Sequence, residues 1–338
     1  MIRRGLMFLF DLHCDTIGRL HDNICLKPGE GSFLSEGVFL TEGSLPKTDT
    51  LLHNHGHLAL DRMAGIDWCQ CFAVFMPDQY RGPDAVAYFE SCYRYFQTQL
   101  AQNAGRLAQV QTVGQLKSAL SDGKAAAMLT VEGGSALGGD LSRIGRLAEC
   151  GVRVVTLTWN GENELASGSA TTHGFSGFGR EAVAEMERAG IVADVSHLND
   201  RGFEELAGFA RRPFIATHSN ARSVQNHPRN LTDDQFRHIV SIGGLVGLNF
   251  CVRFLSNDPD PAFPRLAAHL ERFLRLGGED VVALGSDFDG CDVPSWLGSG
   301  EKFPDLYREV CGGFGQGIAD KLFFTNAADF FARWEGGM

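Results

Sequence analysis

The sequence has no long hydrophobic run and no excess of basic residues. No apolar stretch in its 338 residues approaches the roughly 20 residues that a membrane-spanning helix needs. Lys and Arg number 30 against 41 Asp and Glu, which gives a formal net charge of −11. Proteins that bind nucleic acids usually carry a basic face. We therefore expect neither a membrane nor a nucleic acid as a partner.

Paired cysteines are also missing. The nine cysteines are scattered, an odd number without a Cys-x-x-Cys pair, and Cys69 and Cys71 are too close together for a zinc knuckle. The apolar stretch Leu6–Phe10 follows Arg3 and Arg4, but it is shorter than the roughly 7–15 residues of a signal-peptide core. Free thiols without an export signal favour a cytoplasmic protein.

Repeats, low-complexity tracts and Pro/Gly/Ser-rich linkers are absent too, so we expect one domain over residues 1–338. Short apolar runs with little polar alternation are typical of parallel strands buried on both faces. Eight are present: Phe8–His13, Gln70–Met76, Ala126–Val131, Arg153–Thr158, Ile191–Ser196, Pro213–Thr217, Gly244–Asn249 and Val281–Ser286. Eight strand–helix repeats predict an α/β fold of the (β/α)8 TIM-barrel type. A doubly wound open sheet is the alternative.

Helical patterns fill the segments between these runs. They predict helices at Pro83–Gln102, Gly179–Ala189, Asp200–Arg211 and Leu231–Ile242. Capping residues support the last two, because Asn199 precedes one and Thr232 begins a Thr-Asp-Asp pattern in the other. Residues 20–60 fit no strand–helix unit, so we expect a partly irregular insertion after the first strand. We also expect helices at the C-terminal end.

Side chains that bind metal ions stand at the ends of five of the eight runs. They are His13 and Asp15 after the first run, Glu132 after the third, His197 after the fifth, His218 after the sixth, and Asp287 and Asp289 after the eighth. Barrel enzymes carry their catalytic groups at the carboxyl ends of the strands. Imidazole and carboxylate groups bind zinc and similar ions. Scattered surface residues would not follow strand ends, so the pattern predicts a metal-dependent enzyme.

Spacing assigns individual ligands. His13 and Asp15 are two residues apart on a strand, so they project to the same face and can reach one ion. Glu132 has two carboxylate oxygens and can bridge the ions of a two-metal site. His197 and His218 follow consecutive strands and should lie side by side.

The other histidines lie in expected loops or helices, and for most of them the interpretation is a structural or solvated side chain. They are His21, His53, His55, His57, His173, His227, His238 and His269. The run of alternating histidines at 53–57 could capture a metal ion adventitiously, but it does not stand at a strand end.

With these residues in place, the sequence resembles the membrane dipeptidase family (renal dipeptidase, peptidase M19), a group of amidohydrolase-type metal barrels. The resemblance runs from Phe10 to the region of Asn326. The order and spacing of several short motifs carry it: Val131-Glu-Gly-Gly, Val154-Val-Thr-Leu-Thr158, Asp194-Val-Ser-His197, Thr217-His-Ser219, Arg229-Asn-Leu-Thr-Asp-Asp234 and Gly285-Ser-Asp-Phe-Asp-Gly290.

The resemblance implies a zinc dipeptidase with two zinc ions per chain and a hydroxide that bridges them. His13, Asp15 and Glu132 would hold one ion, and Glu132, His197 and His218 the other. Arg229 would bind the terminal carboxylate of the dipeptide, and its planar fork suits the two oxygens. Asp287 would take the proton of the water and pass it to the leaving amine.

One position departs from the family pattern. Many members follow the Thr-Leu-Thr run with a His that contacts the substrate or the forming oxyanion, and here Trp159 stands there. This leaves the metal positions unaffected and puts oxyanion binding and substrate range in question. The chain looks like a cytoplasmic bacterial relative, without the leader and lipid anchor of animal members. For the oligomeric state, a homodimer is the assembly that we expect.

Two other functions stay open. A lactonase, phosphotriesterase or deaminase on a related barrel would keep the metals and change the substrate, but Arg229 and the Asp194-x-x-His197 pattern argue against it. A binding protein on an inactive barrel would lack at least one ligand, and none is missing here. The preferred dipeptides, their stereochemistry and the physiological metal do not follow from the sequence.

Overall fold

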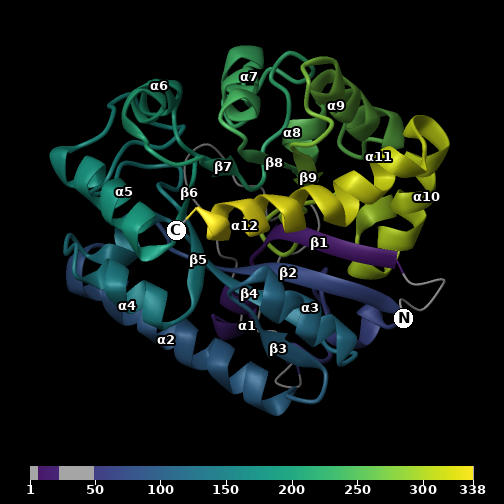
Figure 1. Ribbon diagram of the computed structural model, residues 1–338, viewed down its shortest axis with the longest axis horizontal. Coiled ribbons are helices and arrows are strands. Elements are labelled where there is room, and N and C mark those ends of the chain that lie inside the picture. The colour runs from purple at the N-terminus through teal and green to yellow at the C-terminus, as the bar shows by residue number, and fades with distance from the viewer. Residues whose placement is uncertain (1–6, 23–48, 338) are drawn as a thin grey trace.

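The protein is described here by a computed structural model that covers residues 7–22 and 49–337 (Figure 1). Its centre is a closed barrel of eight parallel strands, in which β2 and β4 pair directly and β1 pairs with β9. These strands are β1 Met7–Cys14, β2 Ile66–Phe75, β4 Ala125–Glu132, β5 Val152–Thr156, β6 Val192–Asp194, β7 Ile215–Ala216, β8 Leu245–Leu248 and β9 Val282–Leu284. Every predicted run overlaps one of them. The barrel prediction is confirmed, and the open sheet is wrong.

The sequence patterns missed one strand, β3 (Leu107–Gln109), which lies outside the ring of eight. It pairs with the first residues of β4, beginning at Ala125. On the same edge of β4, β5 joins only from Leu129 onward, so the first residues of that edge are left for β3. A strand of three residues has too little apolar periodicity to stand out in a sequence.

Helices surround the barrel (Figure 1). The α-helices are α1 Thr16–His21, α2 Gly82–Gln102, α3 Val113–Ser121, α4 Arg143–Glu149, α5 Gly177–Ala189, α6 Asp200–Phe209, α7 Asp233–Ser241, α8 Val252–Leu255, α9 Phe263–Arg275, α10 Phe303–Phe314, α11 Gln316–Asp320 and α12 Asn326–Gly336. Short helical turns are η1 Leu60–Met63, η2 Gly134–Leu137, η3 Ser295–Leu297, η4 Gly300–Lys302 and the π-type η5 Lys321–Thr325. The predicted helices and the C-terminal helices are confirmed.

Caps explain where two of these helices begin. The Asn199 side chain accepts a hydrogen bond from the Gly202 amide at the start of α6. Thr232 and Gln235 form a reciprocal capping box at the start of α7. Because Thr232 is the cap, α7 begins at Asp233 rather than at the predicted Leu231.

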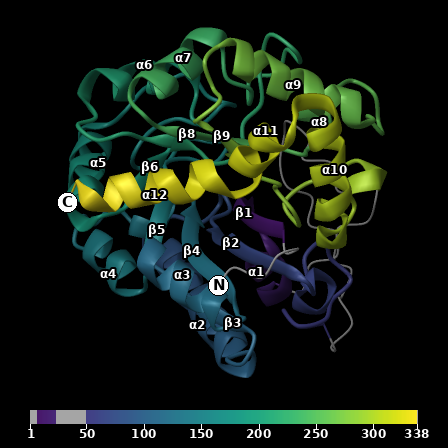
Figure 2. The ribbon, with the colours of Figure 1, turned by 45° about the vertical axis from the view of Figure 1, so that its right-hand side comes forward.

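The barrel interior is a continuous apolar cluster with members from all eight ring strands: Phe10, Leu12, Cys69, Cys71, Ala126, Met128, Val154, Val192, Ile215, Leu245 and Ala283. Side chains of α12, including Phe331 and Trp334, belong to the same cluster. Figures 1 and 2 show α12 lying across one end of the barrel. That end is closed, so the opposite end, where the strands finish, is left for a site.

Part of the predicted insertion at 20–60 falls at 23–48, outside the described residues. The described part, from Asp49 to Gly65, contains η1 as its one helical turn. In the described ranges, no helix is long and apolar enough to cross a membrane. Eight of the nine cysteines are described, and all eight are free thiols, as predicted. Cys25 lies outside the described residues.

Candidate metal centre

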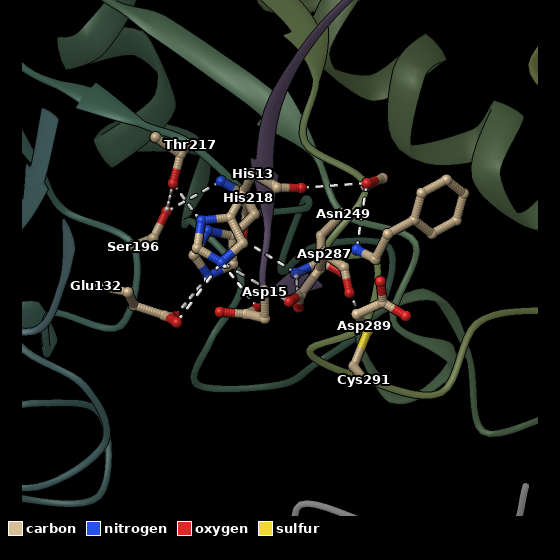
Figure 3. Close-up of polar contacts among 12 residues, drawn as sticks. His13, Asp15, Glu132, Ser196, Thr217, His218, Asn249, Asp287, Asp289 and Cys291 are labelled. Atoms are coloured by element: carbon tan, nitrogen blue, oxygen red, sulfur yellow. Dashed lines mark hydrogen bonds and ion pairs between the residues drawn. The ribbon is translucent and has the colours of Figure 1, made fainter. Parts of the chain in front are cut away.

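All five predicted metal ligands meet at the carboxyl end of the barrel, and Figure 3 shows four of them, His13, Asp15, Glu132 and His218. They are His13 and Asp15 at the end of β1, Glu132 at the end of β4, His197 after β6 and His218 after β7. Each is buried, with at most 7% of its surface exposed. The fold therefore brings together residues that lie as much as 205 positions apart in the chain, as the strand-end rule predicts.

Glu132 lies between two groups of ligands. Its Oε1 is 2.8 Å from His197 Nε2 and 3.4 Å from His218 Nε2. Its Oε2 is 3.6 Å from His13 Nε2, which in turn is 3.3 Å from Asp15 Oδ2. One carboxylate oxygen thus faces each group. Two sets of three ligands result, and Glu132 is the member they share.

The contacts within the cluster fit a cation better than hydrogen bonds. His197 Nε2 and His218 Nε2 are 3.0 Å apart and face the same carboxylate oxygen. His13 Nε2 and Asp15 Oδ1 are buried and have no hydrogen-bond partner among the described residues. Buried polar atoms are nearly always paired, so orphaned atoms of ligand type that converge on one space fit a metal site.

The pKa directions of two of the three imidazoles agree with this interpretation. Burial, together with the positive charge of Arg229, holds the pKa values of His197 and His218 well below the usual value. Both rings are therefore neutral at pH 7, the form that binds metals. Burial alone would lower the His13 pKa, but the Glu132 and Asp15 carboxylates raise it well above its usual value, so this ring must lose a proton when an ion binds. Burial and the nearby Asp15 carboxylate raise the pKa of Glu132 to about 8. Carboxylates buried this close repel one another, and a bound cation removes that repulsion.

Neighbouring side chains set the tautomers of both imidazoles. Thr217 donates its single hydroxyl proton to Asp194 Oδ2 at 2.6 Å, so its oxygen accepts from His218 Nδ1 at 2.8 Å. Asn160 Oδ1 lies 2.9 Å from His197 Nδ1 and accepts from it. With Nδ1 protonated in each ring, both Nε2 lone pairs point into the cluster. Such outer hydrogen bonds commonly orient metal-ligating histidines.

Asp287 lies at the edge of the cluster. Its Oδ1 is 4.0 Å from His13 Nε2, and its Oδ2 accepts a hydrogen bond of 2.9 Å from Asn249 Nδ2. With His13 and His218 it forms a further group that could hold a metal ion. Burial raises the pKa of Asp287. The contacts allow either a proton shuttle or a ligand.

The neighbouring Asp289 is engaged elsewhere. Its Oδ1 accepts from Arg19 Nη1 at 2.5 Å and from the His57 amide at 2.7 Å, while Oδ2 accepts from Thr16 at 2.6 Å. Burial alone would raise the Asp289 pKa, but the charges of Arg19 and His57 and the hydrogen bond from Thr16 lower it. Asp289 therefore anchors the loop to α1 and the insertion.

Backbone strain is concentrated at this end of the barrel. In the described residues, the non-glycine residues with positive φ are His197, Asp287 and Asp289, at 70°, 60° and 65°. Such conformations are uncommon outside glycine and cluster at functional sites. Gly290 allows the loop to pass close by, because a Cβ there would lie 2.1 Å from Asp15 Oδ2.

The two predicted substrate-binding residues border the cluster. Arg229 is buried, its Nη2 donates to the His218 carbonyl at 3.4 Å, and its Nε has no hydrogen-bond partner in the described part of the chain. A buried guanidinium with an unused donor is suited to an incoming anion. The Trp159 ring lies 6.2 Å from that of His197 and packs edge-on against Phe75.

Comparisons with known proteins identify the family. The family model described as "Membrane dipeptidase (Peptidase family M19)" matches residues 5–327. This chain belongs to the membrane dipeptidase family. The resemblance read from the motifs is confirmed, as is the enzyme class of a metallohydrolase of the dipeptidase type.

Three relatives illustrate this membership. A crystal structure of the dipeptidase AC, a metallopeptidase of family M19, is 28% identical, covers 98% of this chain and 100% of its own, and has a TM-score of 0.85. A Rhodobacter sphaeroides metallopeptidase, liganded with a phosphinate mimic of the dipeptide L-Ala-D-Ala, is 27% identical over 97% of this chain and 99% of its own, with a TM-score of 0.84. A Klebsiella pneumoniae protein, described as uncharacterized in the pqqA 5′ region, is 33% identical over 67% of this chain and 89% of its own length.

Sequence reasoning missed two positioning residues of the membrane dipeptidase site. Asn160 orients His197, and Asn249 holds Asp287. Asn249 ends the predicted run at 244–249, so its place at a strand end was a usable indication. Asn160 lies four positions beyond β5, where strand alternation no longer predicts which way a side chain points.

Proposed function

We propose that this protein is a zinc-dependent dipeptidase with two zinc ions per chain. His13, Asp15 and Glu132 would hold one ion, and Glu132, His197 and His218 the other. The position of Glu132 carries the proposal, because each of its carboxylate oxygens faces a different set of ligands. Neutral imidazoles and carboxylates together are a donor set that zinc accepts.

The two ions, when bound, would polarise the scissile carbonyl and supply a hydroxide bridging them as the nucleophile. The chain itself has to position the substrate and move a proton. Arg229 would bind the free carboxylate of the dipeptide with the donor that lacks a partner. Asp287, held by Asn249, would accept the proton of the attacking water and deliver it to the leaving nitrogen.

The substrate class follows from family membership and from these two anchors. A dipeptide has a carboxylate for Arg229 and a scissile carbonyl one residue away, so longer peptides would not fit between the anchors. A phosphinate mimic of L-Ala-D-Ala binds the related Rhodobacter sphaeroides enzyme. We extend the proposal to dipeptides with a D-residue at the C-terminal position, with Trp159 as one wall of the substrate site. A cytoplasmic location and a homodimer stay predictions.

Metal analysis combined with turnover tests this proposal. We expect at least two zinc ions per chain after mild dialysis, and hydrolysis of L,L and L,D dipeptides but not of lactones or phosphotriesters. A protein that is fully active without metal would refute the metal assignment. Hydrolysis of lactones in preference to every dipeptide would refute the substrate assignment.

A further inference from the structure

A second group of metal-binding side chains lies where α1 meets α2. His21 ends α1, and Asp22 is its C-terminal capping residue. Cys92 is on α2, together with Tyr88 and Ser91, which stand four residues and one residue before it. These α2 residues share the helix face that meets His21, since positions three and four apart are neighbours on a helix.

Three ligand atoms converge in this group. His21 Nδ1 is 2.5 Å from Asp22 Oδ1 and 3.4 Å from Cys92 Sγ. All three atoms lie within 4.8 Å of one another. The Cys92 side chain is fully buried, whereas those of His21 and Asp22 are 20% and 22% exposed. An ion could therefore enter from solvent and reach a buried sulfur.

The remaining polar atoms already have partners. His21 Nε2 lies 2.9 Å from the Ser91 hydroxyl, and Asp22 Oδ2 accepts a hydrogen bond of 2.6 Å from Tyr88. When His21 Nε2 donates to Ser91, Nδ1 carries a lone pair, and it faces a carboxylate oxygen. Metal-ligating histidines usually donate their other ring N–H in this way, and ligating carboxylates are hydrogen-bonded in turn.

Without a metal ion, His21 Nδ1–H would donate to Asp22 Oδ1 and toward Cys92 Sγ, and Nε2 would accept from Ser91. In the other tautomer, the Nδ1 lone pair, the carboxylate and the sulfur face one another and need a cation between them. A divalent cation among the three atoms satisfies all of them, and the charges of a thiolate and a carboxylate balance it. A sulfur, a nitrogen and an oxygen donor suit zinc rather than magnesium or calcium, which prefer oxygen alone.

We propose that His21 Nδ1, Asp22 Oδ1 and Cys92 Sγ form a second metal site, specific for zinc or a similar ion, with water as the fourth ligand. When the ion binds, the Cys92 thiol loses its proton to solvent. Because the ion and the proton compete for the sulfur, affinity should increase with pH. The site would tie α1 to α2 two residues after Arg19, the partner of Asp289.

Cobalt spectroscopy tests this proposal independently of the catalytic function. Metal-free full-length protein is loaded with Co²⁺ and followed in the near ultraviolet, where thiolate-to-cobalt charge transfer absorbs. The proposed catalytic ligands bind through nitrogen and oxygen only, so cobalt in the catalytic site gives no thiolate band. Cobalt bound to Cys92 would give one. We expect the band in the wild type and in Cys291→Ser, a control that removes a buried thiol beside Asp287. Cys92→Ser should lose the band and about one metal ion per chain.

A second variant guards against misfolding. His21→Gln changes a half-buried side chain at the end of α1, and it should also lose the band and about one ion per chain. The proposal is overturned if saturating Co²⁺ produces no thiolate band in the wild type. A band that persists in Cys92→Ser, or that disappears in Cys291→Ser, overturns it as well.

Discussion

Replacing Asp287 by Asn separates a proton shuttle from a metal ligand. Asn keeps the shape of Asp, and its side-chain oxygen can still accept the hydrogen bond from Asn249. Asn also tolerates the positive φ of 60° at this position better than most residues do. Asp287→Ala would lack both properties. The Asn variant therefore removes the titrating carboxylate and leaves the backbone and its neighbour in place.

The expected loss of activity follows from the role of the carboxylate. General acid–base catalysis is typically worth about 10²–10⁴-fold, which corresponds to about 3–5 kcal/mol of transition-state stabilisation. Stability should change by less than about 1 kcal/mol, because burial already raises the pKa of Asp287 and the folded protein gains little from its charge. The metal content should stay near that of the wild type.

Asp289→Asn is the matched control, with the same substitution at a φ of 65° two residues away. Asp289 accepts from Arg19 and Thr16 and does not face the ligand cluster. We expect the Asp289→Asn variant to lose about 3 kcal/mol of stability, which is the scale for breaking a buried charge pair. Its kcat should change little. Metal content, kcat and urea unfolding are measured for both variants. If Asp287→Asn empties the site of metal, Asp287 is a ligand and the shuttle assignment is refuted.

Three further predictions concern the ligands, the substrate and pH. Glu132→Gln should lose at least one metal ion and most activity, and elemental analysis with full occupancy would contradict bridging. Arg229→Met should weaken binding of dipeptides by roughly 2–4 kcal/mol and barely affect dipeptide amides, as inhibition constants would show. Burial lowers the His269 pKa from 6.5 to about 4, so the unfolded chain binds the extra proton as pH falls. The free energy of unfolding in urea should drop by about 2 kcal/mol from pH 8 to pH 5 through this group. The His269→Gln variant should lack this pH-dependent decrease.

The catalytic end of the barrel could be predicted because parallel strands bring their carboxyl ends together. His13, Glu132 and His218 follow apolar runs, and this single rule placed them in one cluster. The same rule does not extend to the loops. Asn160 and Arg229 lie on segments whose course is set by tertiary hydrogen bonds, such as that of Leu231 N to Asn220 O. Arg229 came from the family resemblance rather than from periodicity.

Helices offer no comparable rule. His21 and Cys92 are on different helices, and nothing in the residues between them indicates that α1 and α2 touch. His21 lies in an expected loop or helix, where the sequence predicts a structural or solvated side chain. The short edge strand β3 was missed for a related reason, since its place depends on the gap that β5 leaves beside β4.

The proposed metal centre combines strained backbone positions with several buried carboxylates. His197 and Asp287 follow strand ends with positive φ, and each side chain is hydrogen-bonded to a neutral amide side chain. Burial, together with repulsion from the Asp15 carboxylate, raises the pKa values of Glu132 and Asp287. Carboxylates buried side by side cost stability when no cation is bound. Ions that bind this folded arrangement and not the unfolded chain would recover that cost, so stability and catalysis would depend on the same cations.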